Sequence, residues 1–166
     1  AWSADNSQSA IQALAQGGSA TDTVSVLTGD GTSFDIIITI DGTNDAPTAS
    51  GAISASATED SGVQTVDLLQ NTADADTGEA AALTVGSLSA LPGGFSVSGT
   101  DLNIDTTHSA IAALAQGETR VETISYTVTD PQGATVPHSV QVTLTGTNTG
   151  PTIVIGAGSA TAGVSE

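Results

Sequence analysis

The segment Thr123-Ile-Ser-Tyr-Thr-Val128 alternates apolar and polar side chains with a period of two, which is typical of a β-strand with one buried face. Val140-Gln-Val-Thr-Leu144 continues the pattern further along the chain. The expected counterparts and additional strands are Val24–Val26, Ile36–Ile40, Val63–Val66, Leu83–Val85 and Phe95–Val97. Gly, Asp, Asn and Pro separate these segments about every 8–12 residues, which favours a β-sandwich.

The sequence contains an internal repeat. Ser9-Ala-Ile-Gln-Ala-Leu-Ala-Gln-Gly17 recurs 100 residues later as Ser109-Ala-Ile-Ala-Ala-Leu-Ala-Gln-Gly117. Gly42-Thr-Asn-Asp-Ala-Pro47 recurs 104 residues later as Gly146-Thr-Asn-Thr-Gly-Pro151. We expect the four additional residues to lie in the loop of a hairpin, at Asp130–Gly133, because loops tolerate changes in length.

A period of about 104 residues is the size of one β-sandwich domain, and it predicts three pieces. Residues 1–47 are expected to be the last part of one repeat, residues 48–151 a complete repeat, and residues 152–166 the first strand of a third. Both ends of the sequence therefore look like cuts inside a longer protein. Apolar residues on one helical face, followed by a glycine, predict short helices of about two turns at Ser9–Gln16 and Ser109–Gln116.

The composition excludes several classes of partner and of chemistry. The chain has 18 acidic residues and one basic residue, Arg120, so its formal net charge is −17. Nucleic acids and anionic membrane surfaces are excluded as partners because both require Lys and Arg. The absence of Lys and Cys excludes lysine and cysteine catalysis and thiolate metal sites. No run of about 18 apolar residues exists, so we expect no membrane insertion.

Many of the acidic residues lie at strand ends and in loops, at Asn44-Asp45, Asp74-Ala-Asp76 and Asp130. Asp5 and Asp105 are equivalent through the 100-residue offset, and both precede an expected helix. Carboxylate and amide oxygens are the ligands that Ca²⁺ prefers. The alternative is that they are solvated turn residues. A compact chain at −17 repels itself, and each bound Ca²⁺ would remove two negative charges, which favours the cation.

Four segments together resemble a known family: Trp2-Ser-Ala-Asp-Asn6, the Ala-rich segment ending in Gly17, Asp22-Thr-Val-Ser-Val26 and Ile38-Thr-Ile-Asp-Gly-Thr-Asn-Asp-Ala-Pro47. They resemble the VCBS repeat of very large bacterial surface and RTX-type adhesins. The resemblance implies an all-β, immunoglobulin- or cadherin-like Greek-key sandwich of about seven strands, with a short helix in each repeat. It also implies tandem repeats that Ca²⁺ stiffens at their junctions.

The resemblance also implies site residues. In cadherin-like junctions a linker Asn-Asp, a D-x-D motif and a late hairpin Asp converge on calcium with a carboxylate of the preceding domain. The corresponding residues here are Asp5, Asn44, Asp45, Asp74, Asp76 and Asp130. Glu59 resembles a further ligand and would belong to a second junction with Asp105 and Asn148. The second linker departs from the family's pattern, because it has Thr149 where the first has Asp45, so the resemblance supports the first junction more than the second.

The function implied by this resemblance is that of a structural extender of a bacterial cell-surface adhesin, supporting cell adhesion and biofilm formation. The expected location is extracellular, on the cell surface, after type I secretion. The expected partners are neighbouring repeats of the same chain, with strand exchange between chains as an alternative for the incomplete repeats.

A second functional class stays open, namely a β-sandwich module that binds a carbohydrate or a protein ligand. An enzyme is not expected. His108 and His138 are the two histidines, and the sequence has no G-x-S-x-G nucleophile motif. We interpret both histidines as bystanders.

Overall fold

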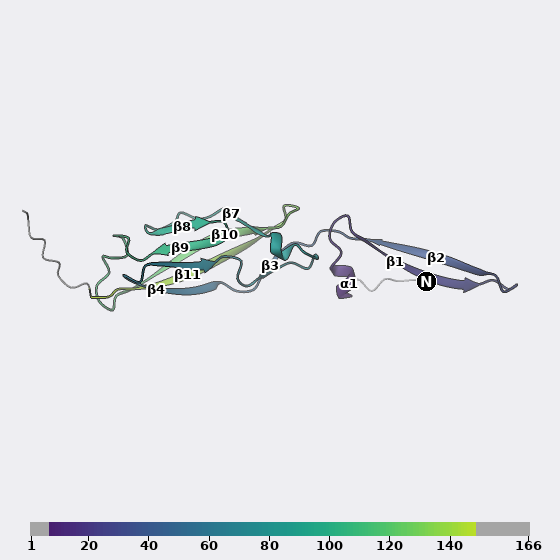
Figure 1. Ribbon diagram of the computed structural model, residues 1–166, viewed down its shortest axis with the longest axis horizontal. Helices are drawn as coiled ribbons and strands as arrows, with labels where there is room; N and C mark the ends of the chain where they lie inside the picture. Colours follow the sequence, from purple (N-terminus) through teal and green to yellow (C-terminus); the bar gives the residue numbers. More distant parts are fainter. Residues whose placement is uncertain (1–6, 149–166) are drawn as a thin grey trace, which may run out of the picture.

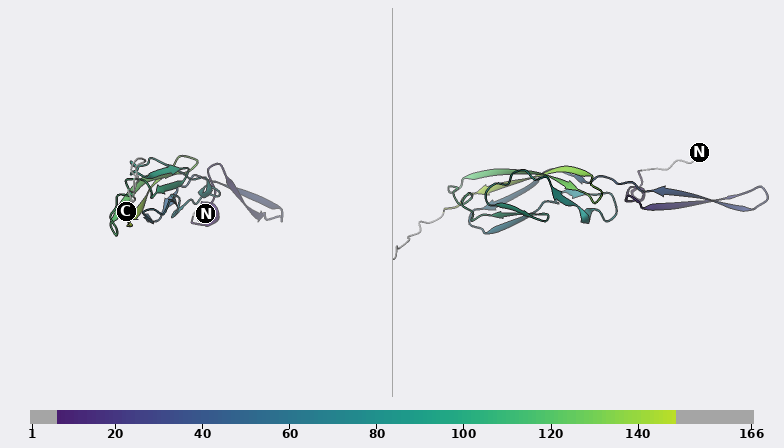
Figure 2. Two further views of the ribbon diagram at one scale, coloured as in Figure 1. Left: turned by 60° about the vertical axis from the view of Figure 1, so that its left-hand side comes forward. Right: turned by 90° about the horizontal axis from the view of Figure 1, so that it is seen from above.

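The computed structural model describes residues 7–148, which form an elongated molecule of two parts placed end to end (Figure 1). The N-terminal part consists of helix α1 (Ser9–Gln12) and a hairpin of β1 (Ser19–Leu27) and β2 (Ser33–Asp41). The remaining strands form a β-sandwich at the other end (Figure 2). The predictions for Asp5 and for a strand within residues 152–166 lie outside the described residues.

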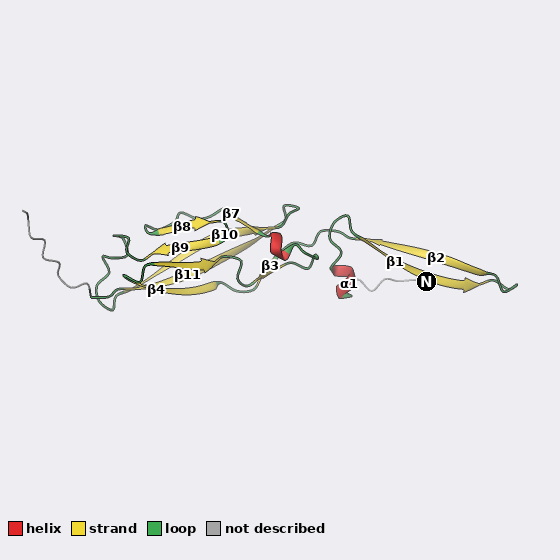
Figure 3. Cartoon of the chain, in the orientation of Figure 1, coloured by secondary structure: helices red, strands yellow, loops and turns green. Residues whose placement is uncertain are grey.

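The sandwich consists of two main sheets, and this confirms the predicted all-β architecture (Figure 3). The four-stranded sheet has the order β4 (Ile53–Thr58), β11 (Thr135–Thr145), β10 (Thr119–Thr129) and β7 (Thr84–Gly86). Its strands pair antiparallel, except that β4 runs parallel to β11.

The second main sheet has three antiparallel strands, β5 (Val63–Asp67), β9 (Asp101–Asp105) and β8 (Phe95–Ser98), in that order. A short ladder pairs β3 (Thr48–Ala49) with β6 (Thr72–Ala73). A single 3₁₀ turn, η1 (Ala80–Ala82), follows β6. The β3–β6 ladder and η1 lie at the end of the sandwich that faces the hairpin (Figure 1).

The core lies between the two main sheets. Alternate residues of β10 and β11 point into it, as the period of two predicts, and Ile124, Val140 and Val142 are completely buried. Leu102 and Ile104 of β9 close the core from the opposite sheet. The hydroxyl of Tyr126 is also buried, but it donates a hydrogen bond of 2.7 Å to the Leu68 carbonyl, so its burial leaves no donor unsatisfied.

The internal repeat is preserved in strand register, but the additional four residues are not in the loop. Each hairpin has a five-residue connection, whereas β1 and β2 have nine residues and β10 and β11 have eleven. The prediction of a longer loop is therefore wrong. The additional residues form two more cross-strand pairs, Val128 with Val136 and Thr129 with Thr135. Extending a ladder keeps the tight turn unchanged, and it carries the turn at Asp130 two residues further along the hairpin.

The helix prediction is only partly right. Helix α1 spans four residues rather than two turns, and Ser109–Gln116 forms turns instead of a helix. The prediction of a short helix in each repeat is therefore wrong for the complete sandwich. Ile111 and Leu114 are buried in the core, and this tertiary packing fixes the turns where a helix this short has little stability of its own. No helix within residues 7–148 is long and apolar enough to cross a membrane.

The apolar face of the β1–β2 hairpin is exposed, although the equivalent face of β10–β11 is core. Val24 pairs with Ile36 in the same way as Ile124 pairs with Val140. Val24 and Ile36 are 40% and 50% exposed, whereas Ile124 and Val140 are both 0% exposed. The two hairpins thus carry the same pattern, and in residues 7–148 a second sheet covers only one of them.

This difference predicts unequal costs for the same substitution in the two hairpins. Ile124→Ala should lower the free energy of unfolding of the sandwich by about 2–5 kcal/mol, because it leaves a cavity in a closed core. Ile36→Ala should cost less than about 1 kcal/mol, because that side chain is half exposed. Equilibrium denaturation of both variants measures the difference. An equal loss of unfolding free energy in the two variants would show that the apolar face of the β1–β2 hairpin is covered in solution.

Candidate metal centre

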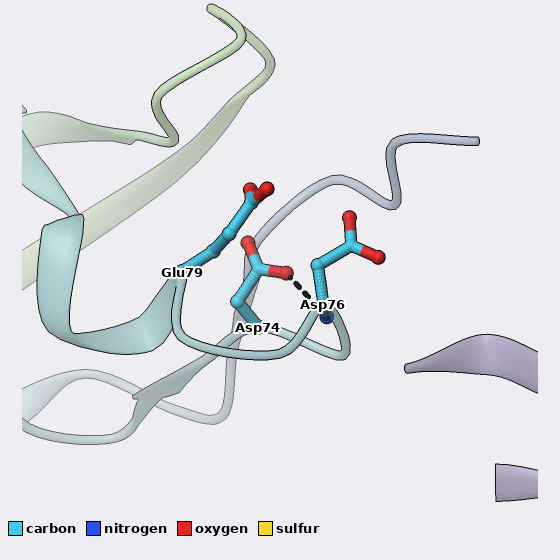
Figure 4. A group of neighbouring side chains, drawn as sticks. All are labelled: Asp74, Asp76 and Glu79. Atoms are coloured by element: carbon cyan, nitrogen blue, oxygen red, sulfur yellow. Dashed lines mark hydrogen bonds between the residues drawn. The ribbon is translucent and has the colours of Figure 1, made fainter. Parts of the chain in front are cut away.

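The loop between β6 and η1 carries a group of three carboxylates (Figure 4). Asp74, Asp76 and Glu79 place one oxygen each within 4.8 Å of one another. Their side chains project to the same side of the loop (Figure 4). The loop turns tightly because the backbone N–H of Asp76 donates to Asp74 Oδ1 at 2.9 Å. Aspartate commonly bonds the backbone two residues ahead in this way, and here the turn gathers the carboxylates at one end of the sandwich.

The linker between the hairpin and the sandwich lies directly against these carboxylates. The backbone N–H of Asp45 donates to Asp76 Oδ2 at 2.8 Å, and Asn44 Nδ2 donates to Asp130 Oδ2 at 2.8 Å. Asp130 belongs to the β10–β11 loop, where Oδ1 accepts the N–H groups of Gln132 and Ala134. Two loops of the sandwich and the linker therefore meet at one place.

Within residues 7–148, the carboxylates of this group are buried without a positively charged partner. Asp76, Glu79 and Asp130 are only 2%, 6% and 4% exposed. The single basic residue of the sequence, Arg120, is engaged elsewhere, with Glu122 at 2.9 Å and with the Ala110 carbonyl. Buried carboxylates without a counter-charge are strongly destabilising, so this arrangement favours a bound cation.

Four buried oxygen atoms at this place have no hydrogen-bond partner within residues 7–148. They are Asn44 Oδ1, Asp74 Oδ2, Asp76 Oδ1 and Glu79 Oε2. In folded proteins such atoms are rare, and a bound ion or water molecule commonly accounts for them. The donors are carboxylate and amide oxygens, with no thiolate or imidazole among them, which suits a hard cation such as Ca²⁺. The chemistry of the residues present therefore fits calcium.

The protonation behaviour of two carboxylates reflects this environment. Burial raises the pKa of Glu79 above its ordinary value of 4.5, and the nearby charges of Asp76, Asp74 and Asp130 raise it further, against the hydrogen bond from Gln132. By contrast, the hydrogen bond from Asn44 lowers the pKa of Asp130 below its usual 3.8, with help from backbone N–H groups of its loop. The hydrogen bonds thus favour the charged form of Asp130, whereas burial disfavours the charged form of Glu79.

The structure brings together five of the residues that the sequence indicated, and it separates the others. Asn44, Asp45, Asp74, Asp76 and Asp130 meet at the linker, through the contacts described above. Asp5 lies outside the described residues.

The residues expected at a second junction lie at the opposite end of the sandwich. Glu59 is 3% exposed, and its Oε2 accepts the N–H of Thr147 at 2.7 Å, while its Oε1 has no partner among the described residues. Asp105 instead accepts hydrogen bonds from the N–H and hydroxyl of Thr107. Neither residue belongs to a group of three candidate ligands within residues 7–148.

Sequence reasoning missed Glu79 as a candidate ligand, together with Gln132. Gln132 Nε2 donates to Glu79 Oε1 at 2.8 Å and so orients the carboxylate. The available signal for Glu79 was its position in Asp74-Ala-Asp76-Thr-Gly-Glu79, in the same short loop as the D-x-D motif. Gln132 carried no such signal, because its contact depends on how the β10–β11 loop folds against the β6–η1 loop.

Comparison with known protein families identifies the sandwich. The profile of the bacterial Ig domain family matches residues 44–143, which is more than half of the chain. The chain belongs to the bacterial Ig domain family. This confirms the predicted immunoglobulin- or cadherin-like sandwich, with a single short α-helix in the described residues. Bacterial Ig domains are typically non-catalytic modules, and they are usually found in surface or secreted proteins.

Similar solved structures cover parts of longer chains. Mouse cadherin-23 EC22–24 is 18% identical, with a TM-score of 0.45, over 76% of this chain and 42% of that one. A nucleoside hydrolase-related hypothetical protein from Saccharophagus degradans, described as associated with carbohydrate metabolism, is also 18% identical. Its TM-score is 0.38, over 62% of this chain and 26% of that one. The chain thus spans less than half of either structure, and no curated protein matches it.

The raised pKa of Glu79 predicts how the metal-free protein responds to pH. The folded state takes up a proton at pH values where the unfolded chain, with an ordinary pKa of 4.5, does not. In EDTA, this group should therefore raise the melting temperature as the pH falls from 7 towards about 5. Below about 3.8, protonation of Asp130, whose pKa is lowered, should act in the opposite direction.

Calorimetry of the wild type and Glu79→Gln at a series of pH values in EDTA measures this effect. The variant cannot titrate at residue 79, so its melting temperature should rise less steeply between pH 7 and 5. Identical slopes for the two proteins would contradict the assignment to Glu79.

Proposed function

We propose that this chain is a structural extender of a bacterial cell-surface adhesin, in which Ca²⁺ stiffens the junction between consecutive sandwiches. The role would be mechanical, since a stiff series of sandwiches holds a distal adhesive domain away from the cell and so supports cell adhesion and biofilm formation. The corresponding location is the extracellular face of the bacterial cell, reached by type I secretion. Membership of the bacterial Ig domain family supports a surface protein.

The observation that carries the proposal is the position of the four buried oxygen atoms that have no hydrogen-bond partner among the described residues. They come from the linker as well as from the sandwich, with Asn44 Oδ1 on one side and Asp74 Oδ2, Asp76 Oδ1 and Glu79 Oε2 on the other. A cation bound by both sets would tie the linker to the sandwich. A site within a single loop would have no such effect on the relative orientation of the two parts.

The residues of the chain have distinct roles in this proposal. Asp74, Asp76 and Glu79 would hold Ca²⁺, while Asn44 and the anionic Asp130 would bring the linker to it. A bound divalent cation neutralises carboxylates that otherwise repel one another across the junction. Its binding energy then becomes stabilisation of the ordered linker, since the unfolded or bent chain lacks the assembled ligands.

The tandem arrangement is part of the proposal. The β1–β2 hairpin, within residues 1–47, would supply the last two strands of a preceding repeat, and residues 152–166 would begin a following one. The identical register of β1–β2 and β10–β11 supports this division. Neighbouring repeats would then cover the exposed hairpin face, and strand exchange between chains is the alternative. The buried carboxylate of Glu59, with Asp105 at the same end, would serve a second junction.

Calcium titration tests the proposal. Melting temperature in EDTA and in a series of Ca²⁺ concentrations should rise by several degrees, because a ligand at about 100 times its dissociation constant adds about 2.7 kcal/mol of stability. Small-angle scattering should show a narrower range of molecular lengths with Ca²⁺ than with EDTA. If chelation changes neither stability nor length, the proposed stiffening is wrong.

A pair of matched substitutions tests whether Ca²⁺ binds at the carboxylates of the β6–η1 loop. Asp76→Asn removes a buried carboxylate charge and should weaken Ca²⁺ binding at least about tenfold in calorimetric titration. Asp101→Asn makes the same change at an exposed position of β9, and it should leave the affinity unchanged. Equal affinities of the two variants would show that any bound Ca²⁺ lies elsewhere.

A further inference from the structure

A second contact joins the N-terminal part to residues 74–79 between β6 and η1, which carry the candidate ligands and are called the metal loop below, and this contact involves no charged group. The carbonyl oxygen of Ala13, the C-cap residue of α1, accepts two hydrogen bonds from Thr77. The backbone N–H of Thr77 donates at 3.2 Å and its hydroxyl at 2.9 Å. Carbonyls at the end of a helix lack intrahelical partners, and a carbonyl oxygen has two lone pairs, so both donors can be accepted.

The chain that follows Ala13 packs closely against the β1–β2 hairpin. Gly42, which follows β2, lies so close to it that a Cβ there would stand 2.3 Å from Leu14 O and 2.4 Å from Ala15 O. The N–H of Gly42 also donates to Gly18 O at 2.8 Å. A contact at Ala13 therefore lies next to a close-packed connection to the hairpin, and it constrains the N-terminal part through that connection.

Thr77 is equally well attached to the sandwich, because it lies within the metal loop. Asp76 directly precedes it and accepts the N–H of Asp45, while the N–H of Glu79 donates to the Asp76 carbonyl at 3.2 Å. Glu79 is in turn held by Gln132 of the β10–β11 loop. The contact between Ala13 and Thr77 thus connects the hairpin to the loop that carries the candidate ligands.

A hollow of about 410 Å³ opens near the contact, lined by polar residues and alanines that include Gln12, Asp45 and Ala73. Next to this open space, the two hydrogen bonds from Thr77 are a direct attachment between α1 and the loop.

We propose that Thr77 and the Ala13 carbonyl form a clasp that orients the two parts without a metal ion, and that this clasp prepares the junction for Ca²⁺. The preparation for Ca²⁺ rests on the proposed function, whereas the metal-free orientation of the two parts does not. Because neither partner is ionised and neither needs a metal ion, the clasp can form in EDTA. By holding linker and loop together beforehand, it lowers the ordering cost of cation binding and so strengthens it.

The same clasp is available at the opposite end of the sandwich. Ala113 is equivalent to Ala13 through the internal repeat, and its neighbour Ala115 is packed against Gly146, where a Cβ would stand 2.3 Å from Ala115 O. Ala113 is exposed, and none of residues 7–148 donates a hydrogen bond to its carbonyl. The partner that fits is a loop of a following sandwich that presents a Thr or Ser hydroxyl beside its own N–H group.

Distance measurement between two spin labels tests the clasp in the whole chain. The sequence has no Cys, so Ser33→Cys in β2 and Ser98→Cys in β8, both exposed, give one specific label in each part. In EDTA, Thr77→Val should broaden the distance distribution relative to the parent, because the hydroxyl donor is lost. Thr77→Ser, which keeps the hydroxyl, should retain the parental width.

Thr65→Val is the matched control. It also removes an exposed threonine hydroxyl that donates a hydrogen bond, in this case to Asn103 Oδ1 at 3.0 Å, but within the β5–β9 ladder of the sandwich. It should leave the distribution unchanged. A Thr77→Val distribution in EDTA as narrow as that of the parent and of Thr65→Val would overturn the clasp. Circular dichroism melting confirms that each variant is folded.

Calcium titration of the same labelled proteins separates the two proposals. Thr77→Val should require about three- to fivefold more Ca²⁺ for half-saturation, as expected for the loss of one exposed hydrogen bond. An unchanged requirement would overturn the preparatory role. If Ca²⁺ has no effect on any of the proteins but Thr77→Val is still broader, the clasp stands and the proposed calcium function fails.

Discussion

The burial of several carboxylates at one place without a positive charge is the constraint on which the junction depends. Asp76 and Asp130 are almost completely buried, and the only basic side chain of the sequence is bound to Glu122. Hydrogen bonds from the linker satisfy one oxygen of each carboxylate, through the Asp45 N–H and the Asn44 amide. The second oxygen of Asp130 accepts N–H groups of its own loop, but Asp76 Oδ1, Asp74 Oδ2 and Glu79 Oε2 have no donor in the described chain. A bound cation would compensate these oxygens.

This constraint relates the fold to the proposed function. A β-sandwich is stable through its own core, so its end loops are free to carry charges that are unfavourable by themselves. In this chain the β6–η1 and β10–β11 loops lie at the same end of the sandwich and meet the linker there. The two additional residue pairs in the β10–β11 hairpin, absent from β1–β2, carry Asp130 to the linker. A difference between two otherwise similar repeats thus serves the site directly.

Much of this could be predicted from the sequence, because the relevant signals are local. Alternation in Thr123–Val128 and in Val140–Leu144 predicted strands that the structure confirms as parts of β10 and β11. The D-x-D motif and the linker Asn-Asp pointed to residues that do meet. The helix at Ser109–Gln116 was wrong because burial of Ile111 and Leu114 overrides a weak local preference. Glu79 and Thr77 were missed because their roles depend on contacts between distant segments, with Gln132 and Ala13.

The most direct test of the account is a crystal structure of the chain grown with Ca²⁺, with anomalous data collected at a wavelength where calcium scatters strongly. The account predicts an anomalous peak among Asp74, Asp76 and Glu79, with oxygen ligands at about 2.3–2.6 Å and at least one ligand from the linker. A map from crystals saturated with Ca²⁺ that shows no peak there, with the carboxylates arranged as described, would contradict it.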